Sequence, residues 1–529
     1  MTEPLMDSSI PRPAGAKRPV FIVAALLLAS FVVGFDTRVF TVGLPDLRGA
    51  FGMGFDEGAW FYTAANAPQI LIAPAVAWLI TVYGVRRIMV PSSIVYSVLS
   101  LSIPAIHDHT LLIIAHVFRA LLLGVFIPAT LMIVFRNLQP KHWLIGLAIY
   151  TLRIPLSQGL GFALVGYYGE DFGWQWLYWQ DVVLAPLIGI FLVLGAPKEP
   201  IDQNQLGKAD WGGMLLLGAS MTFLYVGLDQ GNRLDWLESG TVVSTLMAGG
   251  FLFLLFLGNE AVVAQPWAHV SVLRIRNVSL GLAAVTIFTF ASAMGSSLIP
   301  GMMQTVTALR PYQIGDLFVW YAVIPSFFLV AVSGVALYFI DARIVLIIGM
   351  STTGIAALMG TEVTSQWFPE SFRPILLLST AGQAMTYFAA FVFLVGNSDP
   401  KTSTATSAYI QVCRLGSAEL TSSFIATLIR YREQFHSNAL GVGLANGSPL
   451  LRYRLSELSH LFDRMGNGSA KALATVSASA RAQANVLAYS DSFFAAFWFA
   501  VAGLVVVALM TAAPKSPLSP RSFRAFTSH

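Results

Sequence analysis

Two charged side chains interrupt the first long apolar segment of the chain, which begins near Val20. Asp36 and Arg38 lie there among aliphatic and aromatic residues, in the run Phe35–Pro45. An ionised side chain in hydrocarbon costs at least ~2.5 kcal/mol, so it is retained where it meets a partner or a water-filled cavity. A carboxylate in such a place can take up and release a proton as its surroundings change. Asp36 is therefore our first candidate proton carrier.

Arg119 is the expected partner of Asp36. Counting 1.5 Å per residue along each apolar segment puts both side chains roughly 6 Å to the outer side of the membrane midplane. Opposite charges at one depth on different helices can pair, which lowers the cost of burying them. We keep two interpretations of this pair: proton coupling, and a static ion pair that only fixes the register of two helices.

A later segment carries a second set of charges, Arg414 and Glu419, on either side of the midplane. Their five-residue separation puts them on different parts of a helix surface. They are candidates for proton coupling, with Glu419 as the second proton carrier, or for a static ion pair. Arg153 is expected near the midplane of another segment. Arg38, Arg153 and Arg414 together favour anionic or weakly acidic amphiphiles as the transported molecules.

Polar, methionine and aromatic residues near the midplane are expected to line a path for such a molecule. For any single methionine or aromatic residue, packing against lipid or the protein core is the alternative. Besides Arg38 and Arg153, the candidates are Asn66, Gln69, Gln158, Met294, Gln304, Gln383 and Tyr387.

The composition identifies the elements that must hold these residues. The chain has 529 residues, of which 56% are hydrophobic and only 11% charged, whereas soluble proteins carry about 25% charged residues. A helix needs roughly 20 apolar residues to cross a bilayer. These features predict an all-α polytopic membrane protein. The single cysteine, Cys413, excludes an internal disulfide.

About fourteen segments meet the length requirement for a membrane span. The predicted spans are 20–45, 58–82, 88–106, 110–135, 143–168, 178–196, 211–229, 241–263, 278–306, 313–340, 344–360, 371–396, 404–430 and 491–513. They divide the chain into a tail at 1–19, a six-helix half at 20–196, two additional helices with linkers at 197–277, a second six-helix half at 278–513 with a long outer loop at 431–490, and a tail at 514–529.

Lys and Arg gather in alternate connections, and the positive-inside rule then puts both tails in the cytoplasm. A weak repeat relates the two halves. Val76–Leu79, followed by Arg87–Val90, is echoed by Val335–Tyr338, followed by Arg343–Leu346. Repeated halves are typical of alternating-access transporters. The two equivalent cytoplasmic turns, the second with Asp341 and Arg343, are therefore expected to take part in a conformational change.

The long outer segment has a helical pattern of its own. Leucines recur at helical spacing from Leu451 to Phe462, Gly466–Gly468 breaks the pattern, and Ala470–Leu487 favours helix. We expect a helical hairpin on the outer face. It is either a passive connector or a docking surface for another protein.

Several motifs give the chain a resemblance to a known family. Asp36–Thr37, an aliphatic run and Leu44–Pro45 form the first. Arg119 with the later Pro128 forms a second, and the Trp174–Trp176 pair a third. Over nearly its whole length the chain resembles the fourteen-span drug:proton antiporter branch of the major facilitator superfamily, of the EmrB and QacA kind.

The same resemblance assigns two conformational motifs. Gly84, Arg86 and Arg87 match the family's loop between spans two and three, and Gly161 and Gly166 match its antiporter motif in span five. Departures from the family pattern include Arg38 in place of an aliphatic residue, Leu122–Leu123 in place of Gln-Gly, Phe162 in place of a central proline, and Asp181 where the family often has asparagine.

The resemblance implies a proton-coupled efflux antiporter, not an enzyme. It would export hydrophobic or weakly acidic compounds across a bacterial inner membrane by alternating access, driven by the proton gradient without a cofactor. A metabolite exporter and a proton-coupled uptake symporter are the alternatives. Residues 440–489 are the candidate contact with a periplasmic adaptor and an outer-membrane channel. No nucleotide-binding or zinc-protease motif is present, and we expect no nucleic-acid partner and no metal.

Overall fold

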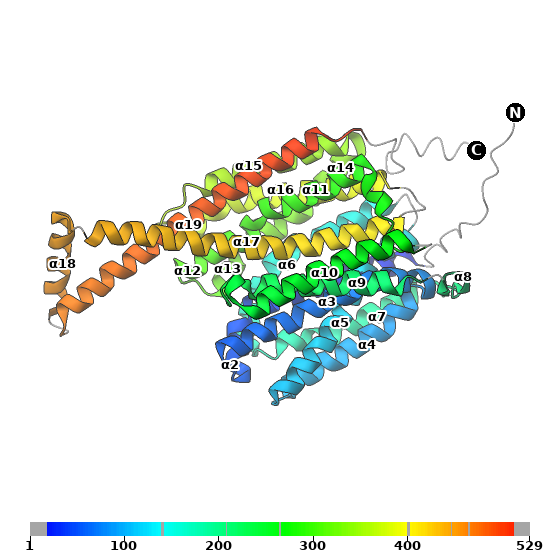
Figure 1. Cartoon of the computed structure of the whole chain (residues 1–529), viewed down its shortest axis with the longest axis horizontal. Coiled ribbons are helices and arrows are strands. Elements are labelled where there is room, and N and C mark those ends of the chain that lie inside the picture. Colours follow the sequence, from blue (N-terminus) through cyan, green and yellow to red (C-terminus); the bar gives the residue numbers. More distant parts are fainter. Residues whose placement is uncertain are drawn as a thin grey trace.

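The computed structural model of the protein describes residues 18–512 except 139–141, 208, 264–265, 399–402, 446 and 464–465. The described chain is helical and contains no strand. Its long helices lie side by side in an elongated bundle (Figure 1). We call the end at which α1 begins and α19 finishes the termini end, and the opposite end, from which α17 and α19 project, the extension end. The predicted tails fall almost wholly outside the described residues.

Thirteen helices of the described chain are long and apolar enough to cross a membrane. They coincide with the first twelve predicted spans and the last one. The remaining predicted span falls on α17, Ser403–Ala445, which is more polar than the others because it carries charged residues such as Arg414 and Glu419. The chain is a multi-pass integral membrane protein.

The first half contains six long helices. α1 ends at Gly43, and Pro45 then occupies the first turn of the short helix α2, where its missing N–H leaves no helical hydrogen bond unmade. α1 packs against α5, α6 and α7, α3 against α5, and α4 against α7. The bounds are α1 Pro19–Val42, α2 Leu44–Phe51, α3 Phe55–Tyr83, α4 Val85–Ser102, α5 His109–Asn137, α6 Trp143–Tyr167 and α7 Trp176–Gly195.

The second half repeats this plan, with two of its spans interrupted by π-helical turns. The turn Met294–Leu298 precedes Pro300, and the turn Val319–Val323 precedes Pro325. A proline lacks the N–H that would bond four residues back, so the helix adjusts locally at both places. The bounds are α11 Arg276–Ala291, α12 Ile299–Thr305, α13 Pro311–Phe318, α14 Ile324–Phe339, α15 Ala342–Gly360, α16 Arg373–Gly396, α17 Ser403–Ala445 and α19 Gly468–Ala508.

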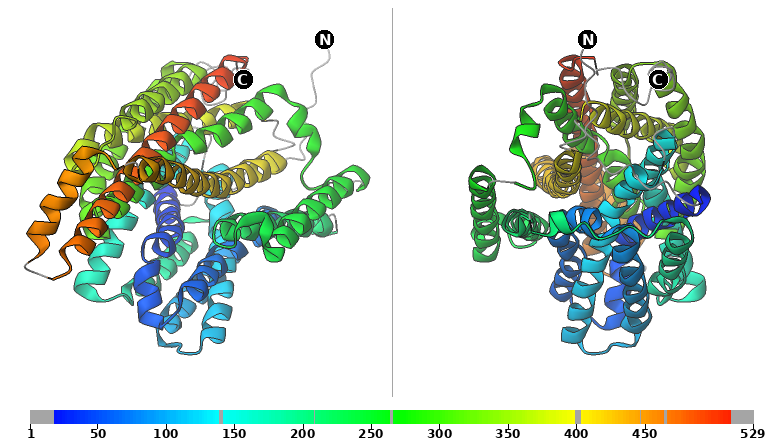
Figure 2. Two further views of the ribbon diagram at one scale, coloured as in Figure 1. Left: turned by 60° about the vertical axis from the view of Figure 1, so that its left-hand side comes forward. Right: turned by 90° about the vertical axis from the view of Figure 1, so that its right-hand side faces the viewer.

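The two additional helices, α9 (Trp211–Gly231) and α10 (Gly240–Val262), pack against each other at the side of the bundle (Figure 2). α9 also packs on α3 of the first half and on α17 of the second half. The Trp78 and Trp211 rings, 4.9 Å apart, join α3 to α9. The additional pair therefore bridges the two halves along one flank.

The long outer segment at 431–490, where we expected a helical hairpin, is helical. α17 continues without a break to Ala445, the short helix α18 spans Pro449–Phe462, and α19 begins at Gly468. The ends of α17 and α19 project beyond the bundle with α18 at the tip (Figure 1). Asp491 on α19 accepts hydrogen bonds from Arg432 and His436 on α17, both at 2.6 Å, and so joins the two helices where the projection starts.

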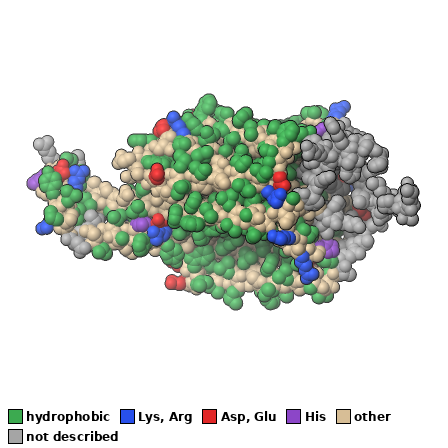
Figure 3. All heavy atoms as spheres, turned by 90° about the horizontal axis from the view of Figure 1, so that it is seen from above, with side chains coloured by type: hydrophobic (Ala, Val, Ile, Leu, Met, Phe, Trp, Pro, Cys, Tyr) green, Lys and Arg blue, Asp and Glu red, His purple; other side chains and the backbone are tan. Residues whose placement is uncertain are grey.

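The flanks of the bundle are apolar. Large side chains such as Met247, Phe328 and Phe339 are 70–78% exposed, as expected for positions that face lipid. The view in Figure 3 shows a largely hydrophobic body with sparse charged side chains. Charged residues buried inside this bundle are therefore exceptional and mark candidate functional sites.

Candidate functional site

The most deeply buried charges form a triad inside the first half. Arg119 on α5 donates from Nη2 to Oδ1 and Oδ2 of Asp36 on α1, at 3.0 and 2.9 Å. The same nitrogen donates to Oδ2 of Asp181 on α7 at 2.7 Å. Both carboxylates are fully buried and Arg119 is 2% exposed. The predicted contact between Asp36 and Arg119 is confirmed, and Asp181 joins it.

The surroundings hold Arg119 in one orientation. Its Nε donates to the Ser100 hydroxyl on α4 at 2.9 Å, and its guanidinium carbon lies 4.6 Å from the centre of the Tyr96 ring and 5.3 Å from that of Tyr178. His116, one turn earlier on α5, makes a 3.1 Å hydrogen bond with the Tyr178 hydroxyl. Four helices therefore meet at a single cation.

The signal for Asp181 in the sequence is a carboxylate in place of the family's asparagine, inside an apolar segment. The Oδ1 atom of Asp181 is buried without a hydrogen-bond partner among the described residues. Two carboxylates around one guanidinium leave an excess negative charge, which a single proton would cancel.

Arg38 connects this helix with the second half. Its Nη1 donates to the Ser296 carbonyl at 3.3 Å, in the π-helical turn. Pro300, four residues later, has no N–H to offer that carbonyl, and the Arg38 guanidinium supplies a donor to it. Arg38 lies two residues after Asp36 on α1. Any movement of α1 therefore changes both the contact of Asp36 with Arg119 and the contact of Arg38 with Ser296.

Glycines of α6 allow close packing near the extension end. A Cβ atom on Gly166 would lie 2.5 Å from the Tyr312 Cα atom of α13 in the second half, and one on Gly161 would lie 2.7 Å from the Arg38 Cβ atom of α1 in the same half. Gly159 is equally tight against Val323. We call the packing of Gly159 and Gly166 against Val323 and Tyr312 of the second half the glycine seal. The helices can approach this closely because glycine has no side chain.

Polar residues also cross between the halves at this end, but they are exposed. Arg310 lies 3.8 Å from Glu170, and their side chains are 79% and 45% exposed. Burial raises the pKa of Asp46, on α2, and the charge of Arg310 opposes this shift. Exposed pairs of this kind contribute less than about 1 kcal/mol, so the glycine seal is the main contact here.

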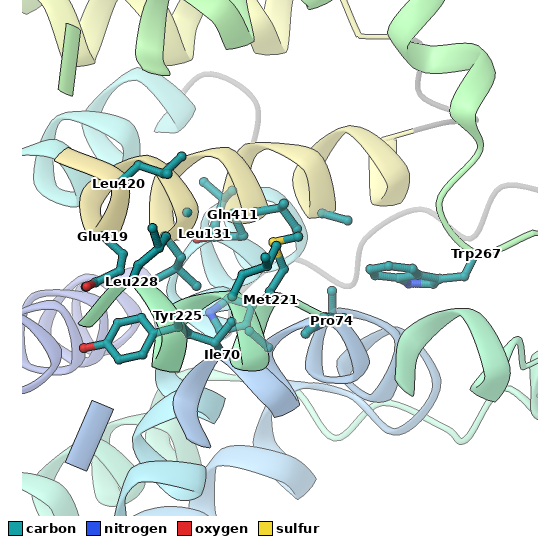
Figure 4. Close-up of a pocket in the computed structure, with 18 of the residues that line it drawn as sticks. Ile70, Pro74, Leu131, Met221, Tyr225, Leu228, Trp267, Gln411, Glu419 and Leu420 are labelled. Atoms are coloured by element: carbon teal, nitrogen blue, oxygen red, sulfur yellow. The ribbon is translucent and has the colours of Figure 1, made fainter. Parts of the chain in front are cut away.

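An apolar cavity of about 260 Å³ lies between the first half, the additional helices and α17 (Figure 4). Its size suits a small organic molecule. Its lining includes Ile70, Pro74, Leu131, Met132, Met221, Tyr225, Leu228, Leu246, Trp267, Gln411, Leu415 and Glu419. Sequence reasoning did not predict that α9 and α10 contribute to a cavity, because nothing in their spacing places them between the halves.

The carboxylate of Glu419 and the phenol of Tyr225 lie at one end of this cavity, and Trp267 lies at the other (Figure 4). Tyr62 lies near Glu419 and Tyr225, and Asp229 on α9 accepts hydrogen bonds from Thr63 and Gln230. The alternative of a static ion pair between Glu419 and Arg414 is wrong. Their five-residue separation turns them to different sides of α17, and Arg414 donates to Gln411 at 3.0 Å.

Arg414 instead faces Arg153 of the first half. Gln411 donates to the Tyr150 hydroxyl at 3.5 Å, and the Arg153 guanidinium carbon lies 5.0 Å from the Tyr150 ring centre. The aliphatic stem of Arg153 packs beside Gly34 of α1. Of the predicted substrate residues, Arg153 thus lies at the interface between the halves, on the α17 side.

Other predicted substrate residues meet within or next to the second half. The Tyr387 hydroxyl is 3.3 Å from that of Thr289 and 3.4 Å from that of Ser292. Gln383 donates to the Ser292 carbonyl at 3.3 Å. Gln158 of the first half approaches the same π-helical turn at Gly295, so Gln158 and Gln383 are neighbours across the interface.

None of the nine predicted substrate residues lines the cavity, and four of them lie away from the contacts described so far. Gln69 donates to Asn66 at 3.1 Å, so both amides are engaged on α3. Met294 is fully buried in the core and Gln304 is exposed on α12. Their assignment to a substrate path stays a prediction.

The predicted gating turns lie at the termini end. Gly84 has a φ of 81° between α3 and α4, a conformation that favours glycine, and Arg86 and Arg87 follow in the first turn of α4. In the equivalent turn of the second half, Arg343 donates to Asp341 at 3.0 Å and to the Met510 carbonyl of the segment after α19 at 3.2 Å.

The electrostatics of this second turn are well defined. Partial burial alone would raise the pKa of Asp341, but the hydrogen bonds from the Arg343 side chain and backbone amide outweigh burial and lower that pKa. The charged pair therefore holds the turn, and the hydrogen bond from Arg343 to the Met510 carbonyl ties the turn to the segment after α19.

Two repeated six-helix halves, with buried charges between their helices and a cavity at their interface, define a membrane bundle of the transporter type. Residues 26–418 match the Major Facilitator Superfamily, and the chain belongs to this family.

Known relatives agree with this assignment. The chain is 24% identical over 299 residues to the probable multidrug resistance protein EmrY of Escherichia coli, with 56% of this chain and 58% of the relative covered. It is 21% identical over 295 residues to the multidrug export protein EmrB of the same organism, covering 56% and 57%. The chain thus spans somewhat more than half the length of these relatives. The solved structure of the proton:xylose symporter XylE has the same fold, with a TM-score of 0.54 at 12% identity and coverage of 92% and 95%.

Proposed function

We propose that this protein is a proton-coupled exporter of hydrophobic and weakly acidic organic compounds, working by alternating access. The observation that carries the proposal is the buried triad of Asp36, Arg119 and Asp181, which shares helix α1 with the Arg38 contact to the second half. Similarity to the multidrug export protein EmrB, and to the probable multidrug resistance protein EmrY, supports the direction of transport.

The proposed coupling runs along α1. In the outward-open protein, a proton entering from the extension end neutralises a carboxylate of the triad and weakens its attraction to Arg119. α1 is then free to shift, Arg38 meets the Ser296 carbonyl, and the glycine seal closes. Loss of the proton toward the termini end restores the ion pair and lets substrate bind. With substrate bound, Arg38 withdraws, the seal opens toward the extension end, and the substrate is released.

The proposed substrate site is the apolar cavity. Its aliphatic and methionine lining selects by size and hydrophobicity more than by shape. Glu419 at one end, beside Tyr225, is the second proton-linked carboxylate of the proposal. No bound cofactor is needed, because the proton gradient supplies the energy.

We further propose that the extension end faces the periplasm, that both termini are cytoplasmic and that the membrane is a bacterial inner membrane. The projecting ends of α17 and α19 with α18 then stand where an adaptor protein and an outer-membrane channel would meet the transporter. Leu450, Tyr453 and Leu461 on α18 are 64–79% exposed and offer apolar contacts to such a partner.

Removing residues 446–467 and joining the helices with a short linker tests the partner proposal. Export across the whole cell envelope should stop while transport in isolated vesicles continues. If both continue at the wild-type rate, the projection is not a docking surface.

Everted vesicles with an acidic interior test the function itself. The expected result is uptake of 2-naphthoate and of the neutral dye N-phenyl-1-naphthylamine, with proton release from the lumen. A weak acid is passively excluded from an acidic compartment, so its uptake requires transport. Uptake that persists when nigericin collapses the gradient, or net movement out of these vesicles, would overturn proton-coupled export.

A further inference from the structure

Two arginines, one from each half, face each other beside the cavity. Arg153 and Tyr150 belong to α6, and Gln411 and Arg414 belong to α17. The Arg414 Nε donates to Gln411 at 3.0 Å, and Gln411 donates to the Tyr150 hydroxyl at 3.5 Å. The guanidinium carbon of Arg153 lies 5.0 Å from the centre of the Tyr150 ring. These four side chains form one continuous chain across the interface.

The two guanidiniums have no carboxylate partner among the described residues. Arg153 is 5% exposed, and in the part of the chain that the structure describes the buried Arg414 Nη2 has no hydrogen-bond partner. They lie near enough for their like charges to repel. This contrasts with Arg119, which has two carboxylates. Buried cations are normally paired with anions. Two arginines without such a partner, at the interface between the halves, therefore indicate a site for an anion from outside the chain.

The cavity lies directly next to this couple. Gln411 and Leu415 line the cavity, and Gln411 is the residue that Arg414 holds. Glu419, the carboxylate nearest along α17, lies at the end of the cavity with Tyr225 (Figure 4). A molecule with its apolar part in the cavity and an anionic group past Gln411 would place that group between the two arginines.

We propose that Arg153 and Arg414 form an anion-binding site that takes the carboxylate or sulfonate group of an amphiphilic substrate. Guanidinium groups suit this role because their planar donors match the two oxygens of a carboxylate. A bound anion removes the repulsion between the halves and replaces it with attraction to both, so it draws α6 and α17 together. This inference rests on the proposed export function and specifies the substrate class for it.

Equilibrium binding to the purified full-length protein, in nanodiscs of phosphatidylcholine, tests the site. The probes are 2-naphthoate and its uncharged analogue 2-naphthamide, which share the same apolar part. Arg153→Gln and Arg414→Gln should each weaken naphthoate binding by at least about 10-fold, the effect of losing one charged hydrogen bond. Naphthamide binding should stay within about twofold of wild type, which also shows that each variant is folded.

Two further sets of variants sharpen the test. Arg274→Gln removes an exposed charge from a surface segment and should leave the affinity for both probes unchanged. Arg153→Lys and Arg414→Lys keep the charge without the planar donors and should recover part of the naphthoate affinity. Recovery by lysine would distinguish charge recognition from simple packing.

The outcomes separate this site from the export function. Unchanged naphthoate affinity in both Gln variants, or an equal loss for naphthamide, would overturn the site even if proton-driven export is observed. Arginine-dependent naphthoate binding without proton-driven uptake in vesicles would support the site and overturn the function. Displacement of naphthoate from wild type alone by phosphatidylglycerol would put a lipid headgroup in the site and overturn its assignment to substrate.

Discussion

The Nη2 atom of Arg119 lies 2.9 Å from Oδ2 of Asp36, between two helices of the same half and away from solvent. This pair lies apart from the apolar cavity, whose lining includes neither residue. Proton uptake at the triad and substrate binding in the cavity therefore occupy separate places in the proposed mechanism. They must be linked through the movement of helices, and α1 is the element that touches both the triad and the second half.

Asp36→Asn removes the charge that holds Arg119 to α1 while keeping the size of the side chain. Substrate binding should remain, and proton-driven uptake into everted vesicles should fall to the background level. Proton release from the purified protein on substrate addition should disappear with it. Asp56→Asn, at a side chain that is 78% exposed, is the matched control and should transport as wild type. Full proton-linked uptake by Asp36→Asn would contradict a coupling role.

Asp181→Asn should leave the protein as stable as the wild type or more stable. It removes one of two carboxylates around a single guanidinium, and the asparagine oxygen can still accept from Arg119. Arg119→Ala leaves both carboxylates buried without their partner and should cost about 3–5 kcal/mol. Thermal unfolding in detergent compares the two variants. A loss of stability in Asp181→Asn as large as in Arg119→Ala would show that Asp181 is needed as an anion for folding.

Gly166→Leu should keep the halves apart at the extension end, because even a Cβ atom at this position meets the Tyr312 backbone at 2.5 Å. In a Cys413→Ser background, a reporter cysteine introduced by Ala163→Cys, opposite Gly315, should react with a maleimide about 10-fold faster than without the leucine, a shift of about 1.4 kcal/mol in the opening equilibrium. Arg310→Ala removes only an exposed pair and should change labelling by less than about fivefold. Equal effects of both variants would refute the glycine seal.

Asp341 gives a pH-dependent contribution to stability. Its pKa is lower in the folded protein than in the unfolded chain, because of the Arg343 hydrogen bonds. The pair therefore stabilises the fold at pH values above the unfolded pKa, and the contribution is lost as the pH falls through the folded pKa. Asp341→Asn should lower the melting temperature slightly at pH 7, by less than about 1 kcal/mol in stability because the side chain is a third exposed. The difference from wild type should shrink on acidification, and a difference that grows would contradict this assignment.

The sequence was sufficient for the helices and for the pair of Asp36 and Arg119. The spans follow from the length of the apolar runs. Asp36 and Arg119 could be matched because opposite charges at the same depth in an apolar bundle have few other charged groups to pair with. Asp181 was missed because depth does not reveal which helices are neighbours, and α7 packs against α1 through contacts spread along both. Arg414 was assigned to Glu419 as one alternative, whereas its neighbour Arg153 is 261 residues away and comes close only when the halves assemble.

The cavity depends on the same long-range packing, and α9 supplies part of its wall. Met221 lines the cavity, whereas Met247 on α10 is 70% exposed on the flank of the bundle. Met221→Trp should fill much of the cavity and weaken the binding of N-phenyl-1-naphthylamine by at least about 10-fold, since about 1.4 kcal/mol of contact is lost. Met247→Trp makes the same change on the membrane face and should bind the dye as wild type does. Dye affinity that is equal in the two variants would mean that the additional helices take no part in holding the substrate.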